Sequence, residues 1–243
     1  LAGSARRRKE TIGDLDIVVG VDSEHHDDVA SAILALQGIA DVKGAGDSKI
    51  SLILEASIFE DGFSVGHIDA NVLDAIGGDD YEQLESAGTI DAQVRLVPPE
   101  MFAFTLAYFT GSKEHNIAMR QRAIDRGLRL NEFGLIPEEK AGALKGIEAA
   151  QYSLSAMTEQ EIYSHLDLQW VPPELREDTG EIQSGSEHNL PQLLELDAIQ
   201  GALHNHTVVS DGEATLEQMA DAAQALGWSW LGIADHSPTL KIA

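Results

Sequence analysis

Two aspartates, Asp14 and Asp16, stand between a glycine-, serine- and arginine-rich stretch and the β-branched run of residues 17–19. The β-branched run predicts a strand, and side chains two residues apart on a strand share a face. Two hard carboxylates on one face suit Mg²⁺ that also holds a phosphate, and the turn and four cations of residues 3–9 suit the phosphates. The stretch therefore predicts a nucleotidyl-transfer site. The alternative is a solvent-facing aspartate pair behind a solvated basic loop.

Two further motifs follow along the chain. Residues 108–112 read YFTGS and precede Asn116 and Arg120, and residues 130–135 read LNEFGL. Together with the aspartate pair, and in this order, they resemble the palm and thumb of family X DNA polymerases. The resemblance implies template-directed or gap-filling DNA synthesis in repair, with DNA and deoxynucleoside triphosphates as partners and Mg²⁺ as cofactor.

The resemblance also implies roles for the matching residues. Asp14 and Asp16 would bind both metal ions of the polymerase site. Gly3, Ser4 and Arg7 would hold the phosphates, and Gly13 would allow close approach of the backbone. Tyr108, Phe109 and Gly111 would border the sugar. Asn116 would face the base, and Arg120 would face the DNA template strand. Asn116 and Arg120 lie four residues apart, so they share a helix face. The alternative for the two aromatic side chains is packing in the core.

A third set of motifs lies near the end of the chain. Residues 201–207, 210–212 and 235–237 read GALHNHT, SDG and DHS, and resemble the opening of a PHP phosphoesterase domain. This domain follows the thumb in bacterial and archaeal family X polymerases, and implies metal-dependent 3′–5′ exonuclease or phosphoesterase activity. The implied ligands of Mn²⁺ or Zn²⁺ are His204, His206, Asp211 and His236. The family's later ligands have no counterpart in the chain, so we expect a fragment with an incomplete metal site.

One position departs from the family pattern. The family has a third catalytic aspartate in an Asp-x-Arg motif, where this chain has Gln93 followed by Arg95. An amide can neither add negative charge nor take a proton from a hydroxyl. Asp91 lies two residues earlier on the same strand face, but a single bulge shifts a strand by one residue, not two. Two alternatives therefore stay open: a PHP phosphoesterase with a degenerate, DNA-binding palm, and a non-enzymatic scaffold that binds DNA ends.

The net charge of −25 weighs against nucleic-acid binding at first sight. The distribution of charge weakens this objection, because residues 6–9 hold four of the sixteen cations and residues 106–130 hold five. We interpret the acidic remainder as adaptation to a salt-rich host. The chain has no cysteine, no apolar run of membrane-spanning length and no secretory signal. We therefore expect a cytoplasmic protein, acting as a monomer and not in a membrane.

The predicted fold is an α/β nucleotidyltransferase palm, a small helical thumb and the first βαβ unit of a truncated (β/α)₇-like PHP barrel. The predicted domains are the palm (1–105), the thumb (106–170), a linker (171–197) and the start of the PHP domain (198–243). The predicted strands are 15–21, 49–54, 90–97, 198–204 and 229–234. Helices are predicted over 27–38, from 98, from a Ser112 cap to Gly127, and over 138–150, 158–166 and 215–226. Residues 56–88 are expected to form an elaborated connection.

Overall fold

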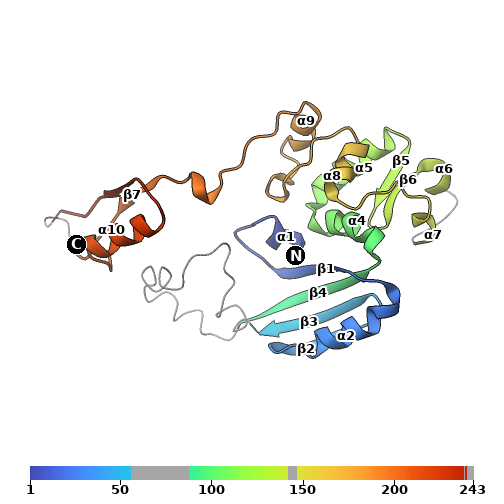
Figure 1. The fold of residues 1–243 in the computed structure, drawn as a ribbon, viewed down its shortest axis with the longest axis horizontal. Helices are drawn as coiled ribbons and strands as arrows, with labels where there is room; N and C mark the ends of the chain where they lie inside the picture. Colours follow the sequence, from blue (N-terminus) through green and yellow to red (C-terminus); the bar gives the residue numbers. More distant parts are fainter. Residues whose placement is uncertain (56–87, 142–146, 238, 240–243) are drawn as a thin grey trace. The chain divides into compact units, whose positions relative to one another are not determined.

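The computed structural model describes residues 1–55, 88–141, 147–237 and 239 (Figure 1). The described chain forms two compact units, one ending at residue 191 and one beginning at residue 192. Apart from its last residue, the predicted connection over 56–88 lies outside the described residues. None of the described helices is long and apolar enough to cross a membrane.

The first unit begins with a four-stranded sheet. Its strands, β1 (Asp14–Gly20), β2 (Ile39–Ala45), β3 (Lys49–Glu55) and β4 (Thr89–Val97), lie in the order β1-β4-β3-β2. β1 and β4 are parallel, and the other neighbours are antiparallel. Alternate residues of β4 are buried, which places its polar side chains on the opposite face. Three of these strands were predicted, and the structure confirms them within two residues.

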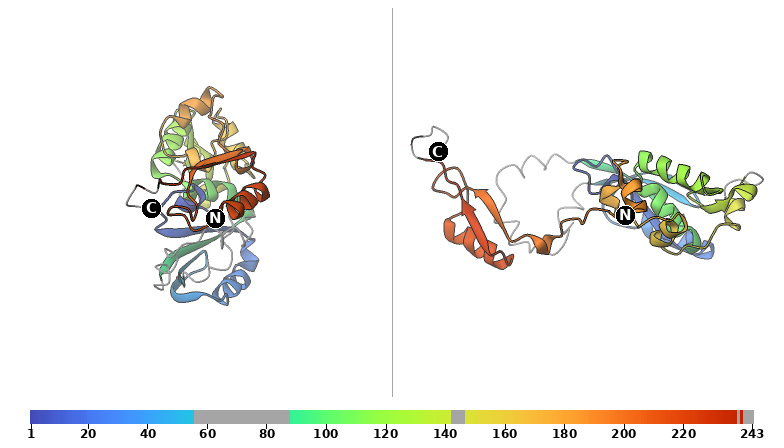
Figure 2. Two further views of the ribbon diagram at one scale, coloured as in Figure 1. Left: turned by 90° about the vertical axis from the view of Figure 1, so that its left-hand side faces the viewer. Right: turned by 90° about the horizontal axis from the view of Figure 1, so that it is seen from above.

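The edge strand β2 was not predicted. Its sequence, IADVKGA, has little β-branched character, and its register with β3 is interrupted twice. Helix α2 (His26–Leu34) packs against β2 and is shorter than predicted (Figures 1 and 2). A 3₁₀ turn, η1 (Ser23–His25), precedes it.

A helical region follows the sheet. It contains α4 (Pro99–Thr110), α5 (Lys113–Ile124), the hairpin β5 (Leu128–Asn131) and β6 (Gly134–Pro137), α6 (Glu138–Ala141), α7 (Ile147–Ala150) and α8 (Glu159–His165). The Ser112 hydroxyl caps α5 as predicted, accepting the His115 N–H at 3.2 Å. The helix ends three residues before Gly127, whose φ of +70° closes the turn into β5. The core gathers side chains from α4, α5, β6 and α8, among them Phe104, Met119, Leu135 and Ile162.

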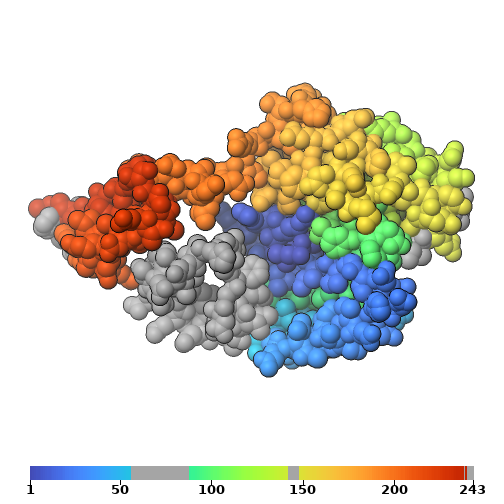
Figure 3. Space-filling model, in the orientation of Figure 1, coloured from blue at the N-terminus to red at the C-terminus, as the bar shows by residue number. Residues whose placement is uncertain are grey.

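Residues 171–191 differ from the predicted linker. They carry η4 (Pro173–Leu175) and α9 (Glu181–Ser186), and they bury Val171, Arg176 and Glu181 within the first unit. In the space-filling view, their gold and orange surface borders the dark blue N-terminal residues (Figure 3). The prolines and the weak periodicity predicted a linker. That prediction was wrong because buried charged contacts hold the segment, and hydrophobic patterning does not detect such contacts.

The strongest of these charged contacts centres on Glu159, whose side chain is 5% exposed. Its two carboxylate oxygens accept hydrogen bonds from Arg6 at 2.8 and 2.8 Å and from Arg176 at 2.7 and 3.0 Å. Arg6 belongs to α1 (Gly3–Arg6), a short helix at the predicted Gly-Ser turn. One buried carboxylate therefore joins α1, α8 and the segment after α8.

The second unit contains a parallel strand pair, β7 (Gly201–Asn205) and β8 (Trp230–Ile233), connected through α10 (Leu216–Ala225). Thr215 forms a capping box with Gln218, and Gly227 has a φ of +73° after the helix. A short 3₁₀ turn, η5 (Leu196–Ala198), leads into β7. The predicted βαβ order is confirmed, and its assignment to a PHP barrel remains a prediction.

We predict that Glu159→Gln lowers the free energy of unfolding by about 3–5 kcal/mol, because it leaves the buried Arg176 without a charged partner. Urea unfolding at pH 7 measures the change. Glu138→Gln is the matched control, since Glu138 pairs with Arg129 at an exposed site and should matter little. Equal effects of the two substitutions would contradict the assigned role of Glu159.

The same carboxylate predicts a pH dependence. Burial alone would raise the pKa of Glu159, but the hydrogen bonds from Arg6 and Arg176 lower it from 4.5 to about 2. A folded-state pKa below the unfolded value gives stability that is present above pH 4.5 and is lost as the pH falls toward 2. Melting curves between pH 7 and pH 3 should therefore show less acid sensitivity in Glu159→Gln than in the parent chain.

Candidate functional site

The predicted aspartate pair lies on one face of β1, half-buried. Burial raises the pKa of Asp16, and the neighbouring Asp14 raises it further, against the opposing pull of Arg95 and Lys49. Two carboxylates that disfavour each other's ionisation are a donor set that a divalent cation would stabilise. The residues present therefore fit the Mg²⁺ that the sequence implied.

The N-terminal helix α1 packs directly on Asp16. The Ala2 N–H donates to the Asp16 carbonyl at 2.7 Å. Gly3 has a φ of +63°, and a Cβ added there would lie 2.8 Å from the Asp16 Oδ2 atom. Gly3 is therefore required both by its backbone conformation and by the space beside the carboxylate. Gly13 has open space around its Cβ position, so no described contact requires glycine there.

Gln93 lies beside Asp16 in the parallel register of β1 and β4, and Asp91 lies beside Asp14. The register runs without a bulge from Asp14 to Gly20, so Asp91 does not move into the place of Gln93. Asp91 instead forms an ion pair with Lys43 at 2.6 Å. The face therefore presents three carboxylates and one amide, with the amide next to Asp16.

Arg95 lies next to this amide. Its Nη2 atom is 3.4 Å from the Gln93 Oε1 atom, and its guanidinium stacks 3.8 Å from the centre of the Phe109 ring. Its buried Nε atom has no hydrogen-bond partner among the described residues. Phe109 therefore contacts the polar face of the sheet and is not simply a core residue.

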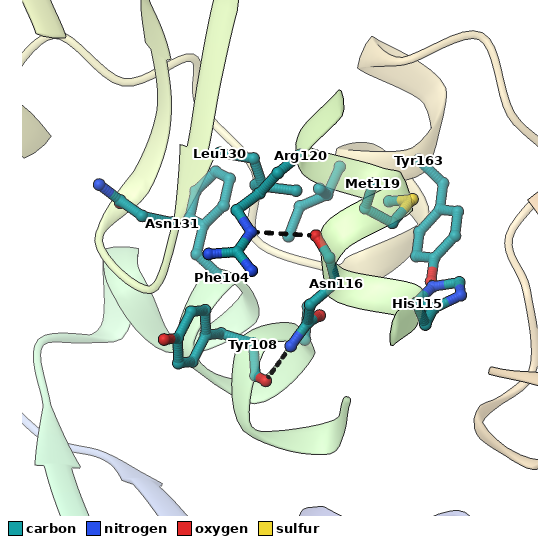
Figure 4. A pocket seen from close by; sticks show the side chains of 11 residues that line it. Phe104, Tyr108, His115, Asn116, Met119, Arg120, Leu130, Asn131 and Tyr163 are labelled. Carbon is teal, nitrogen blue, oxygen red and sulfur yellow. Dashed lines mark hydrogen bonds between the residues drawn. The ribbon is translucent and has the colours of Figure 1, made fainter. Parts of the chain in front are cut away.

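Helices α4 and α5 and strand β5 form a pocket (Figure 4). Its lining includes Phe104, Tyr108, His115, Asn116, Met119, Arg120, Leu130, Asn131, Ile162 and Tyr163. The Asn116 Nδ2 atom donates to the Tyr108 carbonyl at 2.7 Å, and the Arg120 Nε atom donates to the Asn116 carbonyl at 3.2 Å. Three residues predicted for the sugar, base and template strand therefore line one pocket.

His115 anchors the wall of this pocket, although the sequence did not single it out as a site residue. Its Nδ1 atom lies 2.6 Å from the Glu181 Oε1 atom, and its Nε2 atom lies 2.8 Å from the Tyr163 hydroxyl. Burial lowers the pKa of His115, although the bond with Glu181 opposes this. Burial alone would raise the pKa of Glu181, but hydrogen bonds from His115 and backbone N–H groups lower it to about 2. The neutral ring therefore donates to the carboxylate and accepts from the tyrosine.

The cations before the aspartate pair are not free. Arg7 donates from Nε to Glu177 at 2.9 Å and from Nη1 to the Thr110 carbonyl. Lys9 lies 3.5 Å from the same Glu177 oxygen. The sequence placed Arg7 in a phosphate site but gave no sign that an acidic side chain from another segment would pair with it.

The second unit gathers three of the four predicted metal ligands. The His206 Nδ1 atom lies 2.6 Å from Asp211 Oδ1, and the His236 Nε2 atom lies 3.4 Å from Asp211 Oδ2. Their ligand atoms lie within 4.8 Å of one another, a spacing that suits a shared metal ion. His204 is outside this group: its φ is +63°, the strand register shifts there, and its ring stacks on His206 at 5.2 Å. The alternation of side chains along a regular strand therefore did not predict that His204 lies outside the cluster.

Asp235 binds the loop that carries two members of this cluster. Its carboxylate accepts hydrogen bonds from the Thr207 N–H at 2.6 Å, the Thr207 hydroxyl at 2.7 Å and the Ser210 hydroxyl at 2.8 Å. These bonds fix the loop between His206 and Asp211. Asp235 belongs to the DHS motif of residues 235–237, but the sequence did not single it out as a site residue.

Comparison with known proteins gives consistent matches. Residues 105–177 match the family model described as DNA polymerase beta thumb. The chain is 36% identical over 242 residues, 100% of its length, to the DNA polymerase/3′-5′ exonuclease PolX of Bacillus subtilis (strain 168). It is 29% identical over 174 residues, 72% of its length, to DNA polymerase lambda of Arabidopsis thaliana. It covers 35% and 31% of these two proteins, and so spans about a third of their length.

A solved structure shares the fold. Polymerase beta of Leishmania infantum, in a ternary P/T complex, matches with a TM-score of 0.51 at 21% sequence identity. The match covers 72% of this chain and 66% of the solved chain. The likeness shows a mixed α/β fold with a palm and thumb of the polymerase beta kind.

We predict that Zn²⁺ binds the cluster of the second unit, and that His206→Ala weakens this binding by at least about tenfold, because it removes a ligand. Titration calorimetry of the whole chain at pH 7.5 measures the affinity. His25→Ala is the control, since His25 is an exposed histidine of the first unit outside the described cluster. Equal Zn²⁺ affinity of the two variants would contradict the site.

Proposed function

Because this chain carries the palm and thumb of a family X DNA polymerase, we propose that it catalyses nucleotidyl transfer as a DNA-directed DNA polymerase that fills gaps during repair. The observation that carries the proposal is the Asp14–Asp16 pair, which shares one face of β1 and has the glycine of α1 packed against it. The identity to PolX and DNA polymerase lambda supports the same activity.

In this proposal Asp14 and Asp16 hold the Mg²⁺ ions. Bound Mg²⁺ would stabilise the charge of the transferring phosphate and favour ionisation of the 3′ hydroxyl. Gly3 and Ser4 bring the backbone of α1 to the triphosphate, and Arg7 supplies bidentate donors. The contacts between Gly3 and Asp16 support this arrangement, because they place the start of α1 beside the metal-binding carboxylates.

The surface of α4 and α5 around this pocket would contact the nucleotide and the template. Tyr108, Phe109 and Gly111 border the sugar in this proposal, Asn116 faces the base, and Arg120 contacts the DNA. The support is that the Asn116 amide is fixed by the Tyr108 carbonyl and that Arg120 is exposed on the same helix face. An exposed arginine at such a site can pair with phosphate without disturbing the core.

The second unit suggests an additional activity. We propose that residues 198–243 begin a PHP domain and that the whole protein hydrolyses phosphoesters, as a 3′–5′ exonuclease, with Mn²⁺ or Zn²⁺. The cluster of His206, Asp211 and His236 supports this, and so does the PolX match, which runs through the second unit. If the palm is degenerate, this hydrolysis is the main activity and the palm only binds DNA; Gln93 is the observation that favours this second candidate.

Gln93 offers the test that separates the two candidates. We predict that Gln93→Asp raises the rate of nucleotide addition to gapped DNA in Mg²⁺, because it places a carboxylate beside Asp16, at the position of the family's third catalytic aspartate, where it can accept the hydroxyl proton. A positioned base contributes about 10²–10⁴-fold, so a gain of at least about tenfold is expected. The measurement is a single-turnover extension assay.

Gln224→Asp is the control, since it makes the same change at an exposed site of α10. An active parent chain that gains nothing from Gln93→Asp would show that the third carboxylate is not limiting. If neither the parent chain nor the variant adds nucleotides, the polymerase proposal fails and the second candidate takes its place.

A further inference from the structure

Acidic residues of α8 and of the segment after it lie against the basic loop at the N-terminus. Each of the four cations at positions 6–9 has a carboxylate partner in the structure. The pairs are Arg6–Glu159, Arg7–Glu177, Arg8–Glu174 and Lys9–Glu177. The cations that the sequence assigned to phosphate binding are therefore neutralised by the protein itself.

Burial divides these pairs into two kinds. Glu159 is 5% exposed and also holds the fully buried Arg176, so breaking this contact leaves a buried charge unpaired and is strongly destabilising. Glu177 is 28% exposed and Arg7 13%, and the two share one hydrogen bond. A pair that keeps contact with solvent costs less to break than a buried pair. The Arg6 pair is therefore structural, and the Arg7 pair is exchangeable.

Arg7 does not depend on Glu177 for its position. Its Nη1 atom donates to the Thr110 carbonyl, and a Cβ added to Gly111 would lie 3.2 Å from the same atom. The guanidinium is thus held against the backbone of the 110–111 turn. If the Glu177 carboxylate moved away, the guanidinium would keep its place and present its remaining N–H donors.

The segment that carries Glu177 is fixed by other contacts. The Arg176 carbonyl accepts the Ser112 N–H at 2.9 Å, and the Arg176 side chain binds Glu159. Glu181, four residues beyond Glu177, is held by His115. The side chain of Glu177 can therefore leave Arg7 by rotating, with no displacement of the segment.

We propose that the Glu177 carboxylate is an internal counterion of Arg7 that the triphosphate of an incoming nucleotide displaces, so that Glu177 sets the affinity for the nucleotide. The inference rests on the proposed role of Arg7 in phosphate binding. A phosphate group offers more charge than one carboxylate and accepts two parallel hydrogen bonds from a guanidinium, which favours the exchange. The ion pair lowers nucleotide affinity by the free energy needed to break it.

The experiment is calorimetric titration of the whole chain with dATP and Mg²⁺, without DNA. Glu177→Gln keeps the shape of the side chain and removes its charge, so it should tighten dATP binding by about 2–5-fold, the equivalent of a partly exposed ion pair. Glu174→Gln is the matched control, because it frees Arg8 instead, and should leave the affinity unchanged. Arg7→Ala with Glu177→Gln should show no gain over Arg7→Ala alone.

Unchanged or weaker dATP binding by Glu177→Gln would overturn the inference, and so would absence of binding in both the parent chain and the variant. The polymerase proposal is tested separately by nucleotide addition to gapped DNA. Tighter dATP binding by a chain that adds no nucleotide would support the role of Glu177 and refute the polymerase proposal.

Discussion

The buried carboxylate of Glu159 is the contact on which the arrangement of the first unit depends. From α8 it binds Arg6 of α1, 153 residues away in sequence, and Arg176 of the segment after α8. Because the Ala2 N–H at the start of α1 donates a hydrogen bond to the Asp16 carbonyl, fixing Arg6 also fixes the basic loop beside the aspartate pair. A charge that is costly to bury is tolerated here because two guanidinium groups satisfy it.

The carboxylates of this strongly acidic chain have three different roles, and the role of each depends on how deeply it is buried. Glu159 is buried and paired, so it is structural. Asp14 and Asp16 are half-buried and lie side by side, and they would be stabilised by a cation. Glu177 is more exposed and pairs with Arg7 and Lys9, so a more highly charged anion can replace it. Gln93 reduces the charge of the palm face at the position where the family has a third aspartate, which is why we expect the catalytic rate to respond to that position.

Local sequence signals predicted the regular elements well. The β-branched residues of β1 and the caps at Ser112 and Thr215 indicated elements that the structure confirms. Strand periodicity predicted that Asp14 and Asp16 share a face, and helix periodicity predicted the same for Asn116 and Arg120. Whether these residues perform the assigned chemistry remains a prediction.

The remaining features depend on contacts between distant residues. The edge strand β2 has no strong propensity, and the segment of Arg176 and Glu181 is held by buried charges that hydrophobic patterning does not detect. His204 lies outside the cluster of His206, Asp211 and His236, at a point where the backbone of β7 is irregular. The partners of Arg7 and His115 lie 170 and 66 residues away in sequence, so only the folded chain reveals them.

The central claim is that Asp14 and Asp16 carry metal-dependent nucleotide addition. The most direct test is single-turnover extension of gapped DNA in Mg²⁺ by the parent chain and by Asp14→Asn and Asp16→Asn, with DNA affinity measured in parallel. Loss of a metal ligand removes several kcal/mol of transition-state stabilisation. We therefore expect a rate loss of at least about a hundredfold in each variant, with DNA binding retained. Extension by either variant at the rate of the parent chain would contradict it.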